Sequence, residues 1–538
     1  MRVTLAALAA IVLIASCARA SPPAERTLRL AVVAEPRSLV SIFSQSITDN
    51  EIDRLIYDPL IACDREGQPV PALAAVVPTR TNGGISADGL TVTYRLRHGV
   101  RWHDGTPFTA ADVVASFRAV MDPHSIVQSR HGYDVVASVT TPDAYTVRFR
   151  LKHPFAPFVG TIFAESDSPY YLAPAHLLRA GTSPQSPLAT TPVGTGPYRF
   201  VRWVRNDRLE LAANDAYWNG KPAIRNIVIR FIGDENTQLV GLRTGEIDGI
   251  IQLSANAAAL ARSIPHLRLM TSPLNAYWGV MMNTGRGPMA DVRIRRAVAA
   301  VIDARTFRDN VTHGFYAPAI ADLPTVLWAA DRTLHPIAHD PEAARKQLAA
   351  AGYGPGHPLV LDLAILQSSQ THRLEGVVIQ DELRRIGVEV RVHAYLPNVF
   401  DSPPSQGGML TRGRYDIALY GWFAGMDPDD SGQFVCDQRP PVGFNHSFYC
   451  STEMDAAQRD ALASPDEVSR KRVYARIEAL LLRDVPIAFL GSPVAITVWR
   501  DDVSGFAPSL VTTTANAQRW CVGASCANTR VRPSADPP

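Results

Sequence analysis

Residues 359–392 read LVLDLAILQSSQTHRLEGVVIQDELRRIGVEVRV and carry a clear fold signal. The apolar run Leu359–Ile365 predicts a buried strand, a helix extends from it to Ile386, and Val388–Val392 predicts a second strand. A strand, a helix and a second strand in this order form a βαβ-like passage, which is typical of α/β layers. This stretch therefore indicates an α/β fold.

Strands and capped helices alternate along the rest of the chain. Thr27–Val33 is apolar enough for a strand buried on both faces, whereas Thr91–Leu96 and Tyr145–Leu151 alternate as half-buried antiparallel strands do. Capping patterns predict helix starts at 109–112, 340–342 and 464–467. The whole chain thus fits the α/β class.

Length and composition bound the possible functions. The chain has 538 residues, of which 46% are hydrophobic and 19% charged, and its 53 basic residues nearly balance 51 acidic ones. This length suggests three or four domains, and the apolar fraction excludes a disordered or fibrous chain. Because no basic excess exists to neutralise phosphates, an electrostatic nucleic-acid binder is excluded as well.

The N-terminus has the features of an export signal. After Arg2, residues 3–16 carry no charge, a run too short to span a membrane but typical of a signal peptide. The run ends in Ile14-Ala15-Ser16-Cys17, which resembles a bacterial lipobox with Cys17 as the lipidated residue. The alternative is ordinary cleavage after residues 18–20 (ARA). We expect a periplasmic or cell-envelope protein, lipid-anchored to the outer face of the cytoplasmic membrane, with residues 18–26 as a tether.

The cysteines agree with an oxidising compartment. Cys436 with Cys450, and Cys521 with Cys526, are the simplest disulfide pairs because each closes a short loop. Cys63 is then odd, and we interpret it as a buried free thiol. No Cys or His cluster has the spacing of a zinc site.

Motifs for catalysis are largely missing. The sequence contains no G-x-S-x-G, H-E-x-x-H or Walker motif. The glycine-rich Gly194–Pro197 predicts a structural turn, since proline removes a donor that a phosphate would need. Asp427–Gly432 opens like a calcium loop, but Gln438 stands where a bidentate carboxylate is required. His103-Asp104 precedes Gly105 and is interpreted as a turn. We therefore expect no enzyme, no metal and no cofactor.

Two stretches, ADGLTVTYRLR at 87–97 and WHDGTPFTAADV at 102–113, are similar to the signature of the family 5 extracellular solute-binding proteins, the peptide/nickel-type receptors of bacterial ABC importers. Further stretches match in the family's order along nearly the whole mature chain. They are Gly194–Tyr198, Asn214–Trp218, Gly245–Asp248, Asp291–Ala297, Asp340–Tyr353, Leu383–Val392 and Tyr415–Trp422.

The resemblance implies a two-lobed periplasmic-binding-protein fold with a hinge and an extra α+β domain inserted in the first lobe. Mapped onto this chain, a signal peptide at 1–17 and the tether at 18–26 precede lobe one at 27–56, 190–275 and 493–538. The insert spans 57–189 and lobe two spans 276–492. Ligand is expected in the cleft, enclosed by hinge closure.

The resemblance also implies a ligand site after the strand that ends at Trp422. Trp422 and Phe423 are expected to form an apolar wall, with ordinary core packing as the alternative for each. Peptide-binding members carry an aspartate two or three residues past this tryptophan, where it pairs the α-ammonium of the ligand. Here those positions are Ala424 and Gly425. Asp427 is the first carboxylate available and is our candidate for that role.

Four weaker candidates complete the predicted site. Ser44 and Gln45, after the first strand, are polar contacts or a solvated loop. Tyr277, next to Trp278, lines the cleft or packs the hinge. Arg412, with Arg414, holds a ligand carboxylate or is a surface charge.

We expect a monomeric, lipid-tethered receptor that delivers a short peptide to an ABC permease. The missing aspartate leaves open a non-peptide solute such as an oligosaccharide or another polar conjugate. A secreted hydrolase is the distant alternative, and nickel is disfavoured because the histidines are scattered.

Overall fold

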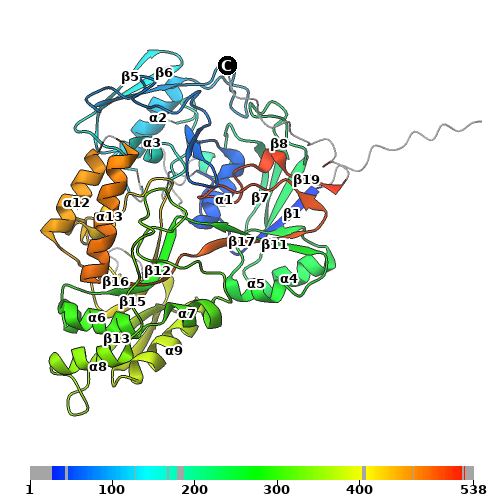
Figure 1. Cartoon of the computed structure of the whole chain (residues 1–538). Helices are drawn as coiled ribbons and strands as arrows, with labels where there is room; N and C mark the ends of the chain where they lie inside the picture. Colours follow the sequence, from blue (N-terminus) through cyan, green and yellow to red (C-terminus); the bar gives the residue numbers. More distant parts are fainter. Residues whose placement is uncertain are drawn as a thin grey trace, which may run out of the picture.

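The computed structural model describes residues 27–523 and Cys526, apart from positions 41, 43–45, 126, 128, 167–168, 179–186, 401, 403–407 and 465 and the side chain at 398. The chain forms two α/β lobes, each built on its own sheet (Figure 1). A further group of small sheets and helices lies above them in this view (Figure 1). Among the described residues, no helix is both long enough and apolar enough to cross a membrane.

The first lobe contains a seven-stranded mixed sheet. Its central strand β1 (Thr27–Val32) pairs in parallel with β9 and β10, so both edges of β1 are hydrogen-bonded and its apolar side chains are buried. This confirms the strand predicted at the start of the mature chain. Helices of this lobe are α1 (Ile47–Ile56), α4 (Glu235–Thr244) and α5 (Ala255–Ala261). The strand order is β11 (Leu267–Pro273), β17 (Val494–Arg500), β10 (Gly249–Ile250), β1, β9 (Asn226–Phe231), β8 (Arg208–Ala213) and β7 (Tyr198–Val204).

The second lobe contains a five-stranded sheet. Strands β13 and β14 pair in parallel and are joined through α9, which confirms the predicted βαβ passage. Helices α12 and α13 pack against each other beside this lobe (Figure 1). The strand order is β14 (Glu389–Tyr395), β13 (Val360–Leu366), β15 (Ile417–Phe423), β12 (Ala276–Met282) and β16 (Ile487–Gly491). The longer helices are α6 (Val292–Val301), α8 (Pro341–Ala350), α9 (Gln370–Arg384), α12 (Thr452–Ala463) and α13 (Glu467–Asp484), and the shorter ones α7 (Ala304–Thr306), η4 (Phe307–Val311), α10 (Pro397–Phe400) and α11 (Ser431–Phe434).

The segment 57–189 carries sheets of its own. Strand β6 (Thr146–Leu151) pairs antiparallel with both β4 (Thr91–Arg95) and β5 (Val136–Asp143), as the alternating pattern predicted. Their apolar side chains join a core shared with residues of lobe two, among them Tyr474 and Leu481 of α13. The segment also contains β2 (Ile61–Cys63), β3 (Pro69–Pro71), α2 (Ala110–Met121) and α3 (Phe158–Thr161).

The chain passes between the two sheets at two places. The first crossover follows β11 at residues 274–275, and the second follows β16 at 492–493. The hydroxyl of Ser492, in the second crossover, donates at 2.7 Å to the carbonyl of Ala276, the residue that directly follows the first crossover. The two connections between the lobes therefore lie next to each other.

The three predicted helix starts are confirmed. Thr109 and Asp112 form a capping box for α2, and Asp340 caps α8. At the third start Asp466 is the cap of α13, whereas Ser464 ends α12.

The glycine-rich turn at 194–197 is structural, as predicted. A Cβ atom at Gly194 would lie 1.9 Å from the carbonyl oxygen of Ile56, so no larger residue fits there. His103 is buried against this turn with its Nε2 3.0 Å from the carbonyl oxygen of Gly196, and burial lowers the pKa of His103 to about 4. Gly105 has φ = 90°, in agreement with a turn after His103-Asp104.

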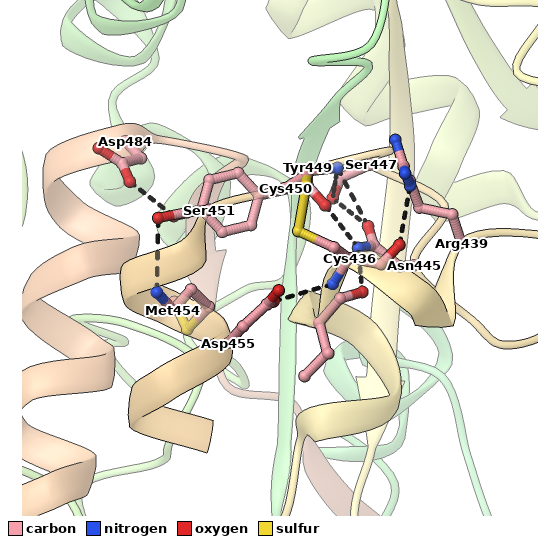
Figure 2. The surroundings of a disulfide bond; sticks show 11 residues. Cys436, Arg439, Asn445, Ser447, Tyr449, Cys450, Ser451, Met454, Asp455 and Asp484 are labelled. Carbon is pink, nitrogen blue, oxygen red and sulfur yellow. Dashed lines mark hydrogen bonds between the residues drawn. A yellow bond between two sulfur atoms is a disulfide. The ribbon is translucent and has the colours of Figure 1, made fainter. Parts of the chain in front are cut away.

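Both predicted disulfides are present: Cys436–Cys450 and Cys521–Cys526. Figure 2 shows the first beside the start of α12, where the amide of Cys436 donates to Asp455 at 3.0 Å. Cys63 is a buried free thiol, as predicted.

Candidate functional site

A cavity of about 270 Å³ lies between the lobes at the two crossovers. Its walls come from α1 and the end of β10 in lobe one, from both crossovers, and from the end of β15 in lobe two. A volume of this order suits a small solute. The lining residues are Ser46, Ile47, Asn50, Glu51, Asp53, Ser166, Pro169, Gln252, Leu253, Leu274, Asn275, Phe423, Ala424, Pro493, Val494, Ala495, Ile496, Leu510 and Val511.

The two predicted wall aromatics lie on opposite faces of β15. Phe423 pairs opposite Ala276, is 37% exposed and lines the cavity. Trp422 pairs opposite Tyr277 and packs on Phe444, with the ring centroids 5.3 Å apart. Because successive side chains of a strand point to opposite faces, only Phe423 of this pair lines the cavity.

Tyr277 packs in the core beside the hinge. Its side chain is 2% exposed, its hydroxyl donates to Gln433 at 2.5 Å, and its ring meets Phe489 edge-on. Tyr277 is not among the residues that line the cavity. Of the two alternatives for Tyr277, the structure thus places it in hinge packing.

Gly425 belongs to the loop that follows the cavity wall. Its carbonyl accepts a hydrogen bond from the side chain of Asn275 at 2.7 Å, and the amide of Ala424 donates to the carbonyl of Asn275 at 2.7 Å. A residue of the first crossover therefore holds this loop in place.

Asp427 lies in an internal ion pair. Its two carboxylate oxygens accept from the guanidinium of Arg470 at 2.6 and 2.7 Å, and the side chains are only 15% and 7% exposed. The pair borders a different cavity, between segment 57–189 and α13. The structure therefore places Asp427 away from the inter-lobe cavity, with a counter-charge already in contact.

Of the remaining candidates, only Arg412 lies among the described residues, and it does not line the cavity. Arg412 is exposed, and its amide donates to the carbonyl of Gly408 at 3.2 Å. Ser44, Gln45 and Cys17 lie outside the described residues. Ser46, which follows Gln45, caps α1 and lines the cavity.

Sequence reasoning missed the acidic face of α1. Glu51 is buried and its carboxylate accepts hydrogen bonds from the backbone and hydroxyl groups of residues 512–514, at 2.8 to 3.1 Å. Burial raises the pKa of Glu51, and these bonds oppose that rise. Asp53 is 1% exposed, and its Oδ1 has no hydrogen-bond partner among the described residues. Burial first, and the nearby Asp49 second, raise the pKa of Asp53 well above its usual value.

Gln252 was missed as well. It has a backbone φ of 65°, which is unusual for a residue with a side chain. Its Oε1 accepts from Thr48 at 3.1 Å, whereas its buried Nε2 has no partner in the described part of the chain. A polar residue two positions after the buried strand β10 was the available signal, because strand ends often line ligand clefts in α/β folds.

The polar groups of the described cavity lining are suited to binding a solute. Within the described residues, no group of three or more His, Cys, Asp or Glu side chains is placed to hold a metal ion. The cavity lining that the structure describes contains two carboxyl groups and no Lys, Arg or His. Its other polar groups are hydroxyls and amides.

Known proteins resemble this chain along most of its length. The chain is 30% identical over 464 residues to di/tripeptide-binding protein 2 of Pseudomonas aeruginosa, a match that covers 81% of this chain and 85% of the relative. It is 27% identical over 488 residues to the glutathione-binding protein GsiB of Pectobacterium atrosepticum, a match that covers 88% of this chain and 91% of the relative.

The fold is also that of solved structures. The Helicobacter pylori ABC transporter-associated periplasmic binding protein DppA, in complex with the peptide STSA, superposes with a TM-score of 0.76 at 24% identity, covering 92% of this chain and 98% of that one. The sequence profile of the bacterial extracellular solute-binding proteins, family 5, matches residues 68–436. The chain belongs to this family of solute-binding proteins.

Proposed function

We propose that this protein is the extracytoplasmic receptor of an ABC importer, which captures a short peptide between its lobes and delivers it to the membrane permease. The observation that carries the proposal is the inter-lobe cavity, whose walls come from both lobes and both crossovers. A solute there contacts both lobes at once and so favours the closed arrangement over an open one. A permease can then distinguish the loaded receptor from the empty one.

The domain division follows from the same proposal. Lobe one comprises residues 27–56, 190–275 and 493–538, the inserted domain spans 57–189, and lobe two spans 276–492. The position of the two crossovers, after β11 and after β16, supports these boundaries. The receptor acts as a monomer and is tethered to the membrane through a lipid on Cys17.

The chemistry of the lining supports a peptide as the solute. Backbone amides of a peptide need donors and acceptors, and Asn50, Ser166 and Gln252 offer both. Phe423 and the aliphatic residues at the start of β17, Val494 and Ile496, supply apolar contact for side chains. The names of the two relatives, which bind di- and tripeptides or glutathione, agree with this choice.

A binding screen tests the proposal. The mature chain is unfolded and refolded to remove retained solute, and is then titrated calorimetrically with di- and tripeptides, glutathione, oligosaccharides and nickel–histidine in separate runs. Binding of di- or tripeptides, with each peptide recovered unchanged by mass spectrometry, is the expected result. Binding of sugars or nickel complexes alone refutes the peptide assignment, and cleavage of the peptide refutes the receptor role.

A further inference from the structure

Asp53 occupies an unusual position in the inter-lobe cavity. It lies near the end of α1, lines the cavity, and is 1% exposed. Its Oδ1 is buried and accepts no hydrogen bond from the described residues. A buried carboxylate in this condition is costly unless a counter-charge or donors reach it.

The charged groups around Asp53 do not supply that counter-charge. The acidic neighbour Asp49 raises the pKa of Asp53 further, and Glu51 is saturated by its bonds to residues 512–514. The adjacent Arg54 instead pairs with Asp58 at 2.9 Å and with Glu165 at 2.8 Å. The buried hydroxyls of Tyr57 and Tyr171 also lie near Asp53, and the pKa of each is raised, first by burial and then in part by nearby carboxylates. Among the described residues, each of these neighbouring groups is therefore neutral, acidic or already paired.

A second polar group in the same cavity is also unpartnered. The buried Nε2 of Gln252 is a hydrogen-bond donor that has no acceptor among the described residues, and its backbone is held at φ = 65°. Backbone strain of this kind is retained where the surroundings enforce it, often at ligand sites. The cavity thus presents one unused acceptor and one unused donor.

We propose that Asp53 pairs with the ammonium group of the bound solute and that Gln252 donates to a carbonyl or carboxylate oxygen of the same molecule. This inference rests on the proposed receptor function and identifies the recognised chemistry as a primary ammonium beside a hydrogen-bond acceptor, as at the N-terminus of a peptide. The ammonium compensates the buried carboxylate of Asp53, which Asp427 cannot do from its pair with Arg470.

The assignment also sets a charge preference. Because the described lining contains no Lys, Arg or His, a solute with extra carboxylates finds no counter-charge there. A peptide with uncharged side chains is therefore preferred over glutathione, which carries two carboxylates and one ammonium.

The test compares free and N-acetylated peptides on matched variants. Refolded wild-type protein, Asp53→Asn and Asp427→Asn are titrated with Ala-Phe and trialanine and with the N-acetyl form of each. For the wild type, acetylation is expected to weaken binding by at least about 100-fold, the scale of removing one partner of a buried charge pair. In Asp53→Asn this difference shrinks to a few-fold because the free peptides lose affinity and the acetylated ones do not. In Asp427→Asn the difference stays as in the wild type.

The other results separate the two proposals. The role of Asp53 is refuted if the affinities of Asp53→Asn for the free and the acetylated peptides still differ by about 100-fold. It is also refuted if this difference in affinity vanishes in Asp427→Asn instead. In both cases the proposed peptide receptor stands. If the wild type binds neither Ala-Phe nor trialanine but binds other peptides of the screen, the free and N-acetylated forms of the tightest-binding peptide are compared on the same three proteins. If no peptide binds at all, the proposed function itself fails.

Two further variants complete the design. Asp53→Ser replaces Asp53→Asn if circular dichroism shows that the latter does not fold. Gln252→Ala is expected to weaken the binding of free and acetylated peptides by the same factor, because the lost amide is proposed to donate to an oxygen of the solute and not to contact its ammonium. A loss confined to the free peptides would contradict the role given to Gln252.

Discussion

The side-chain amide of Asn275 donates to the carbonyl oxygen of Gly425 at 2.7 Å. Asn275 stands in the first crossover between the lobes, and Gly425 follows the aromatic end of β15. The backbone carbonyl of Asn275 also accepts from the amide of Ala424, at 2.7 Å. The wall of the cavity is thereby bonded to a segment that connects the two lobes, and we expect this bond to couple the shape of the site to any movement of the lobes.

Asn275→Ala tests this coupling. The variant leaves the buried carbonyl of Gly425 without its donor, so the free energy of unfolding should fall by about 1–3 kcal/mol. Peptide affinity should fall too, since the wall at Phe423 and Ala424 is no longer held. Urea unfolding and calorimetric titration measure the two effects.

Asn283→Ala is the matched control for Asn275→Ala. Its side chain also donates to buried backbone carbonyls, those of Gly413 and Tyr415 at 3.0 and 3.2 Å, but it does not line the cavity. It should lose similar stability and keep its peptide affinity. Equal affinity losses in both variants would mean that the effect is general destabilisation and not a hinge contact.

Asp427→Asn should destabilise the protein strongly. Arg470 is only 6% exposed and would keep its charge without the carboxylate, a condition that costs about 3–5 kcal/mol. The double variant Asp427→Asn with Arg470→Met should recover part of this loss, because no unpaired charge is left. Urea unfolding of both single variants and the double variant measures the coupling. A loss below about 1 kcal/mol for Asp427→Asn would show that water reaches Arg470.

The stability of lobe two should depend on pH through Glu375. Burial raises the pKa of Glu375 to about 8 from a usual 4.5, a rise that a hydrogen bond from Trp278 at 3.0 Å only partly opposes. A raised folded-state pKa means that the folded protein holds the proton more tightly than the unfolded chain. This stabilisation is complete below pH 4.5 and is lost as the pH rises through about 8.

Glu375→Gln should remove most of that dependence. The amide keeps an acceptor for Trp278 and cannot ionise. Above pH 8 the free energy of unfolding of the variant should therefore exceed that of the wild type by about 2–4 kcal/mol. Urea unfolding at a series of pH values measures the difference. Glu389→Gln, at an exposed glutamate on β14, is the control and should follow the wild-type curve. If the free energies of unfolding of the wild type and Glu375→Gln change in parallel with pH, Glu375 is not the source of the pH dependence.

Removing the Cys436–Cys450 disulfide should lower the free energy of unfolding by about 3 kcal/mol. The bond joins residues 14 positions apart, and its loss frees that loop in the unfolded chain. Replacing Cys521 and Cys526 by alanine, which opens a separation of 5, should cost less, about 2 kcal/mol. Denaturant unfolding of the two double-alanine variants gives the comparison, and equal or reversed losses would contradict the loop-entropy account.

Much of the fold was predictable because its signals are local. The apolar run of β1, the βαβ passage around α9 and the caps at Thr109 and Asp340 depend on neighbouring residues and on fixed helical or strand periods. Both disulfides were predictable for a similar reason, since each joins cysteines close in sequence. The start predicted at 464–467 is likewise local, because Asp466 caps α13 by accepting a hydrogen bond from the amide of Ser469.

The site was less predictable because it is assembled from distant segments. The strand period could have separated Phe423 from Trp422, but nothing near Tyr277 in the sequence indicates that its hydroxyl bonds to Gln433. The resemblance directed attention to the residues after Trp422, whereas the acidic groups that line the cavity come from α1.

The sequence by itself therefore determined the α/β class, the family and the cysteine pairs, because these follow from residues within a few turns or strands of one another. Only the tertiary structure decided which aspartate faces the cavity. Asp427 and Asp53 have the same chemistry, but α13 brings Arg470 against the first. The packing of α1 leaves the second buried beside the cavity, with no cation against it in the part of the chain that the structure describes. That distinction depends on contacts between residues far apart in the chain, which no local pattern contains.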